Sequence, residues 1–338
     1  MADSTLQAIQ NKVRRLTRSP STSQLSDADL NQYINTFVLY NFPSNIRLFN
    51  LRSTLTFYTQ PNIDTYPTDT TNPMNPLFNF KNKYIAVHPP LFMAGIQSFY
   101  TQWRDVFYGY YPQTNTVAMT GLQGDGTPNL QSGVVTAHPM LQNNVIFTCL
   151  DTNGVAMILI DYPIAGSTTS GYLGLPNQTT TVPSVIYGNI EYVTGQFSVS
   201  WPNNTQPAAP IFCENIAYQP GKPLAMLYYD DVFTIRPVPD NVYSIQIEVD
   251  TRPTELLSSS QSPDLEQWWQ YIAYGASLLI FQDRMDLESV QQIMPEYNRQ
   301  ERMVLRTTLT QQANERTVTI YTQGKNYNLG WFGNGWPY

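Results

Sequence analysis

The chain has 338 residues, a formal net charge of -7 at pH 7, and only 13% charged residues beside 13% aromatic residues. This balance argues against a protein that holds nucleic-acid phosphates on a basic face, and against a disordered chain, which lacks the apolar area needed to fold. At this length we expect one discontinuous domain with an insertion.

The first expected helix lies close to the N-terminus. Apolar residues recur at helical spacing in Leu6, Ile9 and Val13, which predicts one buried side. The opposite side would carry a solvated basic cluster of Lys12, Arg14, Arg15 and Arg18,.

The second helix has a clear start signal. The Ser26 hydroxyl can accept a hydrogen bond from a first-turn N–H, and Leu25 and Leu30 occupy the staple positions on either side of it,. We expect this helix to end near Asn41 to Pro43.

Strands are predicted from Leu51 to Tyr58 and, in short runs separated by turn residues, from Tyr84 to Val249. Asn153-Gly154 and Thr194-Gly195 each separate two such runs and predict hairpins, because the favoured turns need residues that accept positive φ. The last pair of runs is Val232 to Arg236 and Val242 to Val249. Closely spaced strands without intervening helices predict an antiparallel sandwich or barrel.

Helical periodicity returns after the strands. Ser262 is the predicted N-cap and Pro263 the first helical residue. A wide apolar stripe predicts that this helix faces a core: Leu265, Trp269, Ile272, Ala276 and Leu279. Asp286 is expected to cap a further helix to Met294, followed by a polar helix from about Glu296 to Gln312.

The sequence shows few arrangements of residues that are typical of a catalytic or metal site. Neither His88 nor His138 has a Cys or His at metal-ligand spacing,. Four carboxylates lie at the ends of predicted strands: Asp151, Asp161, Asp230 and Asp231. Asp is common in turns at such positions, and it indicates a catalytic site only where a pocket shifts its pKa. We therefore predict no enzyme, no catalytic residue, no cofactor and no metal.

Cys149 and Cys213 are too few for a disulfide framework and form no CxxC pair, so two buried free thiols are expected,. No run approaches the roughly 18 apolar residues of a membrane span, and the first ten residues lack a signal-peptide core. We expect no membrane partner and synthesis in a cytoplasm.

The tail from Thr317 to Tyr338 combines a short β-like run with Gly and Asn residues that disfavour a helix,. Its aromatic side chains are costly to leave in water and suit a partner's groove. The predicted docking residues are Tyr327, Trp331, Phe332, Trp336 and Tyr338. The alternative is that the tail folds back on its own domain.

The order of these parts resembles the head-to-tail adaptors of short-tailed bacteriophages, the tail tubular or head-completion proteins that ring the portal. The resemblance rests on LSDADLNQYINTFVLYNFP at Leu25 to Pro43, LRSTLTFYTQPNIDTY at Leu51 to Tyr66, and VFTIRPVPDNVYSIQIEVDTRP at Val232 to Pro253, followed by the closing helices. The β region from Asn82 to Tyr228 lies outside it.

The resemblance implies an α+β fold with a helical base of residues 1–60 and 255–316, a β-rich insertion of residues 61–254, and an extended aromatic arm of residues 317–338. It implies a homo-oligomeric ring, commonly a dodecamer, at the head-to-tail junction of the virion, made in the host bacterial cytoplasm. Its partners would be the portal protein, reached by the aromatic arm, and the tail nozzle or next neck ring. Viral DNA would pass without sequence-specific contact.

Two other functions stay open. The chain could be another neck or tail ring component, such as a stopper, or a carbohydrate-binding tail module built on the β region. An exposed row of Tyr and Trp beside carboxylates would favour the sugar binder, whereas burial of those aromatics between subunits would favour the ring.

Deletion of Gly324 to Tyr338 should abolish binding to the portal and leave thermal unfolding nearly unchanged. The reason is that the glycines of this segment leave it little order of its own, so it contributes little to the isolated fold. A portal pull-down run beside thermal unfolding of both chains checks this. Undiminished binding, or unfolding many degrees lower, would show that the segment packs on its own domain.

Overall fold

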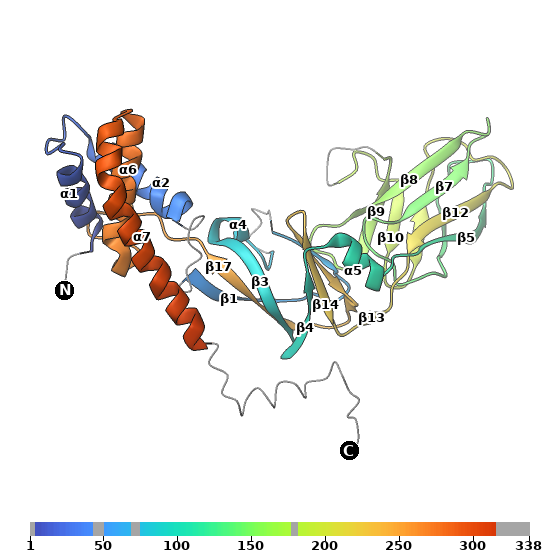
Figure 1. The fold of residues 1–338 in the computed structure, drawn as a ribbon. Helices are drawn as coiled ribbons and strands as arrows, with labels where there is room; N and C mark the ends of the chain where they lie inside the picture. The colour runs from blue at the N-terminus through green and yellow to red at the C-terminus, as the bar shows by residue number, and fades with distance from the viewer. Residues whose placement is uncertain (1–3, 43–50, 69–74, 177–181, 316–338) are drawn as a thin grey trace, which may run out of the picture. The chain divides into compact units, whose positions relative to one another are not determined.

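The computed structural model describes residues 4–42, 51–68, 75–176 and 182–315. The chain divides into two compact units, which we call the helical unit, Met1–Ser53 with Asp250–Tyr338, and the β unit, Thr54–Val249 (Figure 1). The chain therefore combines helices with mainly antiparallel sheets, as the sequence predicts. The predicted aromatic arm lies outside the described residues.

The helical unit is built around one apolar helix. Its elements are α1 (Leu6–Leu16), α2 (Asp27–Thr36), the π-helix η1 (Phe37–Asn41), the 3-10 helix η3 (Glu266–Trp268), α6 (Trp269–Asp283) and α7 (Leu287–Glu315). Helices α1, α2 and α7 all pack against α6. Because neighbours surround it, α6 buries side chains on almost every side, as a fully enclosed helix does,.

The predicted start of α2 is confirmed. The Ser26 Oγ accepts a hydrogen bond from the Asp29 N–H at 3.1 Å, and both Leu25 and Leu30 are buried in the core of the helical unit. The helix continues into η1, which carries Phe37 and Val38 into the same core.

The predicted starts and ends of the closing helices need correction. Ser262 and Pro263 precede the helix, because the Asp264 carboxylate accepts the Thr254 N–H at 2.6 Å and holds this stretch in a turn. The two helices predicted on either side of Pro295 are one helix, α7. Proline removes one N–H from the helix and crowds the carbonyl four residues before it, but burial of Tyr297 and Val304 in the core beyond it favours continuation of the helix. Asp286 caps α7, as predicted, by accepting the Ser289 N–H at 3.1 Å.

The sequence predicts that the basic cluster of α1 is solvated, but the structure shows that only part of it is exposed. Arg14 has a side chain only 11% exposed and pairs with Asp27 at 2.6 Å. Its guanidinium also donates to the carbonyl oxygens of Ser19, Ser21 and Leu25. Lys12 lies over the ring of Tyr274, with 5.4 Å to the centroid. Arg14 therefore fixes the turn between α1 and α2, whereas Arg15 and Arg18 stay exposed.

The first sheet of the β unit has seven strands, in the order β1-β17-β3-β4-β14-β15-β2. Its strands are β1 (Arg52–Tyr58), β2 (Thr65–Pro67), β3 (Tyr84–Met93), β4 (Ile96–Thr101), β14 (Ala225–Tyr229), β15 (Val232–Arg236) and β17 (Ser244–Thr251). Two short helices accompany it, α4 (Phe80–Lys83) and α5 (Arg104–Tyr110). β4 and β14 run parallel, whereas β14 and β15 are antiparallel.

The second sheet has eight strands, in the order β5-β12-β7-β8-β9-β10-β11-β6. These are β5 (Asn115–Gln123), β6 (Gln131–Val134), β7 (Ile146–Leu150), β8 (Ala156–Pro163), β9 (Ser170–Gly174), β10 (Gly188–Glu191), β11 (Gln196–Val199) and β12 (Pro210–Ile216). A two-stranded sheet pairs β13 (Pro220–Gly221) with β16 (Val238–Pro239).

Both large sheets curl, and each encloses its own apolar core (Figure 1). They are therefore not the two faces of one sandwich. In the eight-stranded sheet the outermost strands approach one another, with the Gln131 Nε2 donating to the Gln123 carbonyl at 3.0 Å. The predicted buried thiols are confirmed, since Cys149 and Cys213 are free and lie inside this sheet.

Both predicted hairpins are present, as β7–β8 and β10–β11. In the first, only Gly154 has a positive φ, of 79°, so the turn does not place both central residues there as expected. The Asp151 carboxylate instead accepts the N–H groups of Asn153 and Val155, both at 2.8 Å. The last two predicted runs, β15 and β17, are not neighbours, because β17 lies between β1 and β3.

Aromatic rings fill the centre of the helical unit. Phe37 of η1 meets Tyr271 of α6 edge-on with ring centroids 5.3 Å apart, and Tyr271 stacks on Tyr297 of α7 at the same distance. The hydroxyl oxygens of the two tyrosines are 3.1 Å apart. Gly275 lets α6 approach this cluster, because a Cβ at that position would overlap the Phe37 ring.

Replacing Gly275 with alanine should therefore lower the free energy of unfolding by about 1–3 kcal/mol through overpacking. Gly109→Ala is the matched control, because Gly109 is also helical and an added Cβ would meet nothing within 4 Å. Denaturant unfolding of both variants and of Gly275→Ala/Phe37→Leu checks the cause, since the smaller side chain should restore part of the loss. Equal stability of Gly275→Ala and the parent chain would disprove the close approach.

Candidate docking surface

The docking residues predicted from the sequence, Tyr327, Trp331, Phe332, Trp336 and Tyr338, lie outside the described residues. The structure therefore leaves that prediction untested. A second candidate is found on the β unit, where helix α5 follows strand β4.

Helix α5 combines one buried ring with exposed apolar neighbours. Phe107 is completely buried against Ala225 and Leu227 of β14. Val106, Tyr110 and Trp103, which directly precedes the helix, follow one another at steps of three and four and stay exposed to solvent,. Trp103 is 71% exposed and Tyr110 is 72% exposed. An apolar stripe on a helix is ordinarily buried, so this one is available to a partner.

Neighbouring strands extend the stripe. The Phe99 ring of β4 meets Tyr110 edge-on with centroids 5.9 Å apart, and the Phe99 N–H donates to the carbonyl of the exposed Leu224 at 3.0 Å. The Arg104 guanidinium lies 5.7 Å from the ring of Tyr229, and the same distance from Tyr108. We call these exposed residues the α5 surface: Phe99, Trp103, Val106, Tyr110, Leu224 and Tyr229.

The composition of the α5 surface matches the centre of protein interfaces. Trp, Tyr and Arg dominate binding energy there because they bury large areas and still offer a polar group. Beside the surface, burial raises the pKa of Tyr100 to about 12, so this phenol stays neutral at physiological pH.

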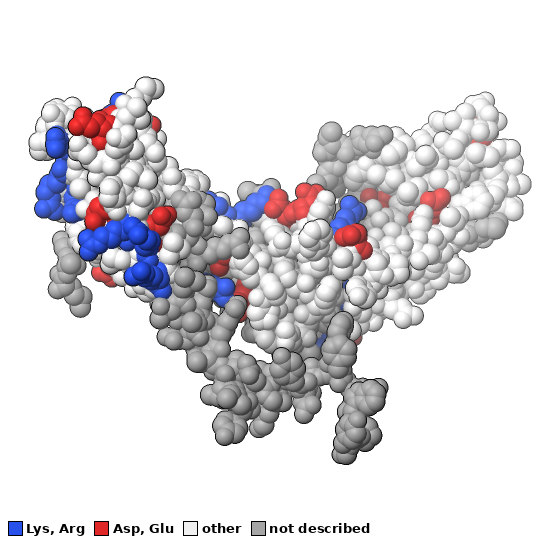
Figure 2. All heavy atoms as spheres, in the orientation of Figure 1, with Lys and Arg blue, Asp and Glu red and all other residues white. Residues whose placement is uncertain are grey.

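Positive charge is distributed unevenly along the chain. Arg104 is followed by no Lys or Arg until Lys222, so the eight-stranded sheet carries no cation. Figure 2 shows the Lys and Arg side chains gathered mainly over the helical unit, whereas the charged groups visible over the eight-stranded sheet are Asp and Glu. An interface with phosphate groups is therefore disfavoured on this sheet.

Asp151, Asp161 and Asp231, three of the predicted strand-end carboxylates, have structural partners. Asp161 is only 5% exposed and accepts hydrogen bonds from the N–H groups of Asn143 and Val145 and from the Tyr192 hydroxyl. Burial raises the pKa of Asp161 in spite of these bonds. Asp231 pairs with Lys81 at 2.9 Å, and Asp151 holds the β7–β8 turn.

The histidines show no metal-binding arrangement. The His138 Nδ1 lies 3.1 Å from the Val193 carbonyl oxygen, which ties the ring to the β10–β11 turn. Among the described residues, His, Cys, Asp and Glu form no group of three or more that could hold a metal ion. Within the same residues, no helix is both long and apolar enough to cross a membrane.

Comparison with known proteins gives no relative. No protein-family model matches the chain, and no curated protein matches it.

Sequence reasoning missed the α5 surface, although its signal was present. Trp103, Val106 and Tyr110 have helical spacing, but Phe107 and Tyr111 extend the same apolar stripe, which predicts that the whole stripe is buried,. The contacts of Phe107 with β14 are needed to decide which side faces the solvent.

Trp103→Ala should change the free energy of unfolding by no more than about 0.5 kcal/mol, because an exposed side chain without a packing partner contributes little. Phe107→Ala, four residues on in the same short helix, should cost about 3–5 kcal/mol through loss of a buried ring. Urea unfolding of the two variants decides whether α5 is oriented as described. A large loss at Trp103 with little loss at Phe107 would reverse the orientation.

Proposed function

We propose that this protein is a structural virion component, the head-to-tail adaptor of a short-tailed bacteriophage. In this proposal several copies form a ring that joins the portal protein to the tail and surrounds the DNA channel. The helical unit is its base, and the β unit is inserted between the two chain segments that form the base.

The exposure of the α5 surface is the observation that supports a docking role. A protein that works by association needs apolar side chains available before its partner arrives, and monomeric proteins rarely expose such groups in one continuous patch. Trp103, Tyr110 and Phe99 supply them on a rigid element, since Phe107 fixes α5 to β14. The assignment to an adaptor, as opposed to another docking protein, rests on the sequence resemblance.

Two further features agree with the proposal. The helical unit is made from both ends of the chain, which allows an insertion of any size between them. The net charge of -7 disfavours tight contact with DNA that must slide through a channel,. In the same scheme the aromatic arm reaches the portal, and the α5 surface contacts a neighbouring subunit or the next ring.

Native mass spectrometry with the portal protein of the same virus tests the proposal. The isolated chain is expected as a monomer or small oligomer, because among the described residues the α5 surface is a small apolar patch compared with the long apolar face of an obligate ring,. A ring of defined stoichiometry should form once the portal is added. A stable dodecamer without the portal at micromolar concentration, or no complex with it, would contradict the proposal.

Matched variants connect assembly to the surface. Trp103→Ser should weaken ring formation, whereas Val117→Ser should not, because Val117 is similarly exposed but lies on β5 of the eight-stranded sheet. Equal assembly of both variants would remove the α5 surface from the interface.

A further inference from the structure

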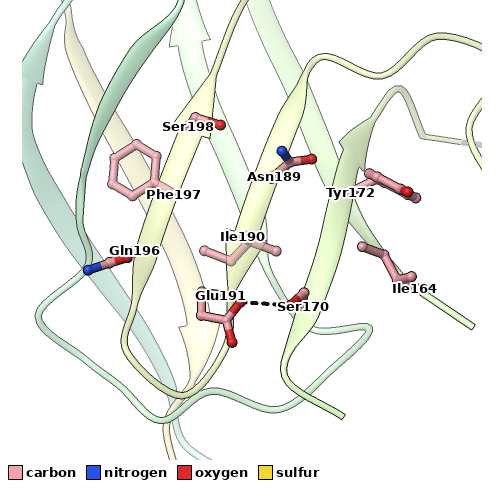
Figure 3. Close-up of a pocket in the computed structure, with 9 residues that line it drawn as sticks. All are labelled: Ile164, Ser170, Tyr172, Asn189, Ile190, Glu191, Gln196, Phe197 and Ser198. Atoms are coloured by element: carbon pink, nitrogen blue, oxygen red, sulfur yellow. Dashed lines mark hydrogen bonds between the residues drawn. The ribbon is translucent and has the colours of Figure 1, made fainter. Parts of the chain in front are cut away.

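A groove lined by both polar and apolar side chains crosses the outer face of the eight-stranded sheet. It has a volume of about 430 Å³, within the range of roughly 300–1,000 Å³ common for small-molecule sites. Figure 3 shows the nine lining side chains, of which all but Ile164 come from the adjacent strands β9, β10 and β11. The polar and aromatic groups that line it are Ser170, Tyr172, Asn189, Glu191, Gln196 and Ser198.

The strand register places these groups on one face. Asn189 is opposite Tyr172 on β9 and Ser198 on β11, and directly opposed residues point to the same side of a sheet. Between them, Ile190 and Phe197 point inward and are almost completely buried. The groove therefore has a firm apolar floor beneath a polar surface.

Hydrogen-bonding capacity in the groove is partly unused. The Ser170 hydroxyl donates to Glu191 at 2.7 Å, the contact dashed in Figure 3. No described residue makes a hydrogen bond to the side-chain amide of Asn189 or Gln196. Each of these amides offers both donors and an acceptor. Ile164 reaches the groove because its N–H donates to the Ser170 carbonyl at 3.1 Å.

The surrounding charge excludes several kinds of ligand. With no Lys or Arg from residue 105 to 221, a phosphate, sulfate or carboxylate would meet Glu191 without a compensating cation. A single carboxylate that already accepts a hydrogen bond is a poor cation site. Peptide addition as a new strand is also excluded, because both edges of β10 are paired within the sheet,.

We propose that this groove binds a neutral oligosaccharide. Hydroxyl groups of a sugar can both donate to and accept from the amides of Asn189 and Gln196, and Glu191 can accept a further hydroxyl. The ring of Tyr172 offers an electron-rich face to sugar C–H groups. Because Glu191 is the only carboxylate in the lining, the groove lacks the acid pair needed for glycosidic hydrolysis. It binds the sugar without cleaving it.

This inference does not rest on the adaptor proposal. The groove lies on the eight-stranded sheet, whereas the α5 surface belongs to the seven-stranded sheet. Either function can fail in experiment without the other.

Saturation-transfer NMR and calorimetry of the full chain test the groove. The neutral probes are maltohexaose, cellohexaose, mannohexaose and N-acetylchitohexaose, with hexagalacturonate as the anionic comparison. At least one neutral probe should bind with a Kd below about 10 mM, and Tyr172→Ala and Asn189→Ala should each weaken it by about tenfold or more.

Thr148→Ala is the control, since Thr148 lies on the outer face of β7, away from the groove. It should bind like the parent chain. If either groove variant unfolds in circular dichroism, Gln196→Ala takes its place. The inference would be wrong if none of the neutral probes bound at a concentration of about 10 mM. It would also be wrong if the groove variants bound the probe as tightly as the parent chain, or if hexagalacturonate bound as tightly as the neutral probes.

Discussion

The two ends of the chain are held together by aromatic packing against helix α6, and the rest of the structure depends on that contact. Phe37, from the N-terminal side, reaches Tyr271 and the surface of Gly275, while Tyr297 closes the cluster from α7. Because residues 54–249 leave this unit and return to it, the β unit is topologically an insertion. Its sheets can be large without adding to the core that joins the chain ends.

Aromatic residues are buried in the core of the helical unit, whereas some of those at helix α5 are exposed. Within the helical unit, rings pack at centroid distances of 5.1 to 6.4 Å and exclude water. At α5, the Phe107 ring is buried, whereas the side chains of Tyr110 and of Trp103, which directly precedes the helix, are exposed to water. The buried Phe107 fixes the position of the exposed Trp103 and Tyr110, so a partner would not have to order this helix on binding. A rigid anchor of this kind suits an assembly protein.

The eight-stranded sheet differs from the helical unit in the chemistry of its surface. It carries no Lys or Arg, and its outer face presents amide and hydroxyl groups such as those of Asn189, Gln196 and Ser198. Such a face cannot attract nucleic acid over a distance, but it offers many neutral hydrogen-bonding groups. The groove around Asn189 and Tyr172 is the place where these groups and an aromatic ring come together on a firm floor.

Most local signals in the sequence predicted local structure, although the Ser262 cap signal did not. The Ser26 cap, the Asp286 cap and the Gly-containing hairpins depend on neighbouring residues, and the structure contains all of them. Features that depend on contacts between distant segments could not be predicted from these local signals. The position of β17 between β1 and β3, the burial of Arg14 and the continuity of α7 through Pro295 are set by contacts between distant segments. The groove was also missed, because Tyr172, Asn189 and Ser198 become neighbours only through strand pairing.

An electron cryomicroscopy reconstruction of the assembled virus particle tests the adaptor function most directly. The expected result is a ring of this chain between the portal and the tail, with the helical units around the DNA channel and Trp103 and Tyr110 buried between subunits or rings. Density for this chain in a fibre or spike away from the neck would contradict the proposal. So would a ring whose α5 surface faces only solvent.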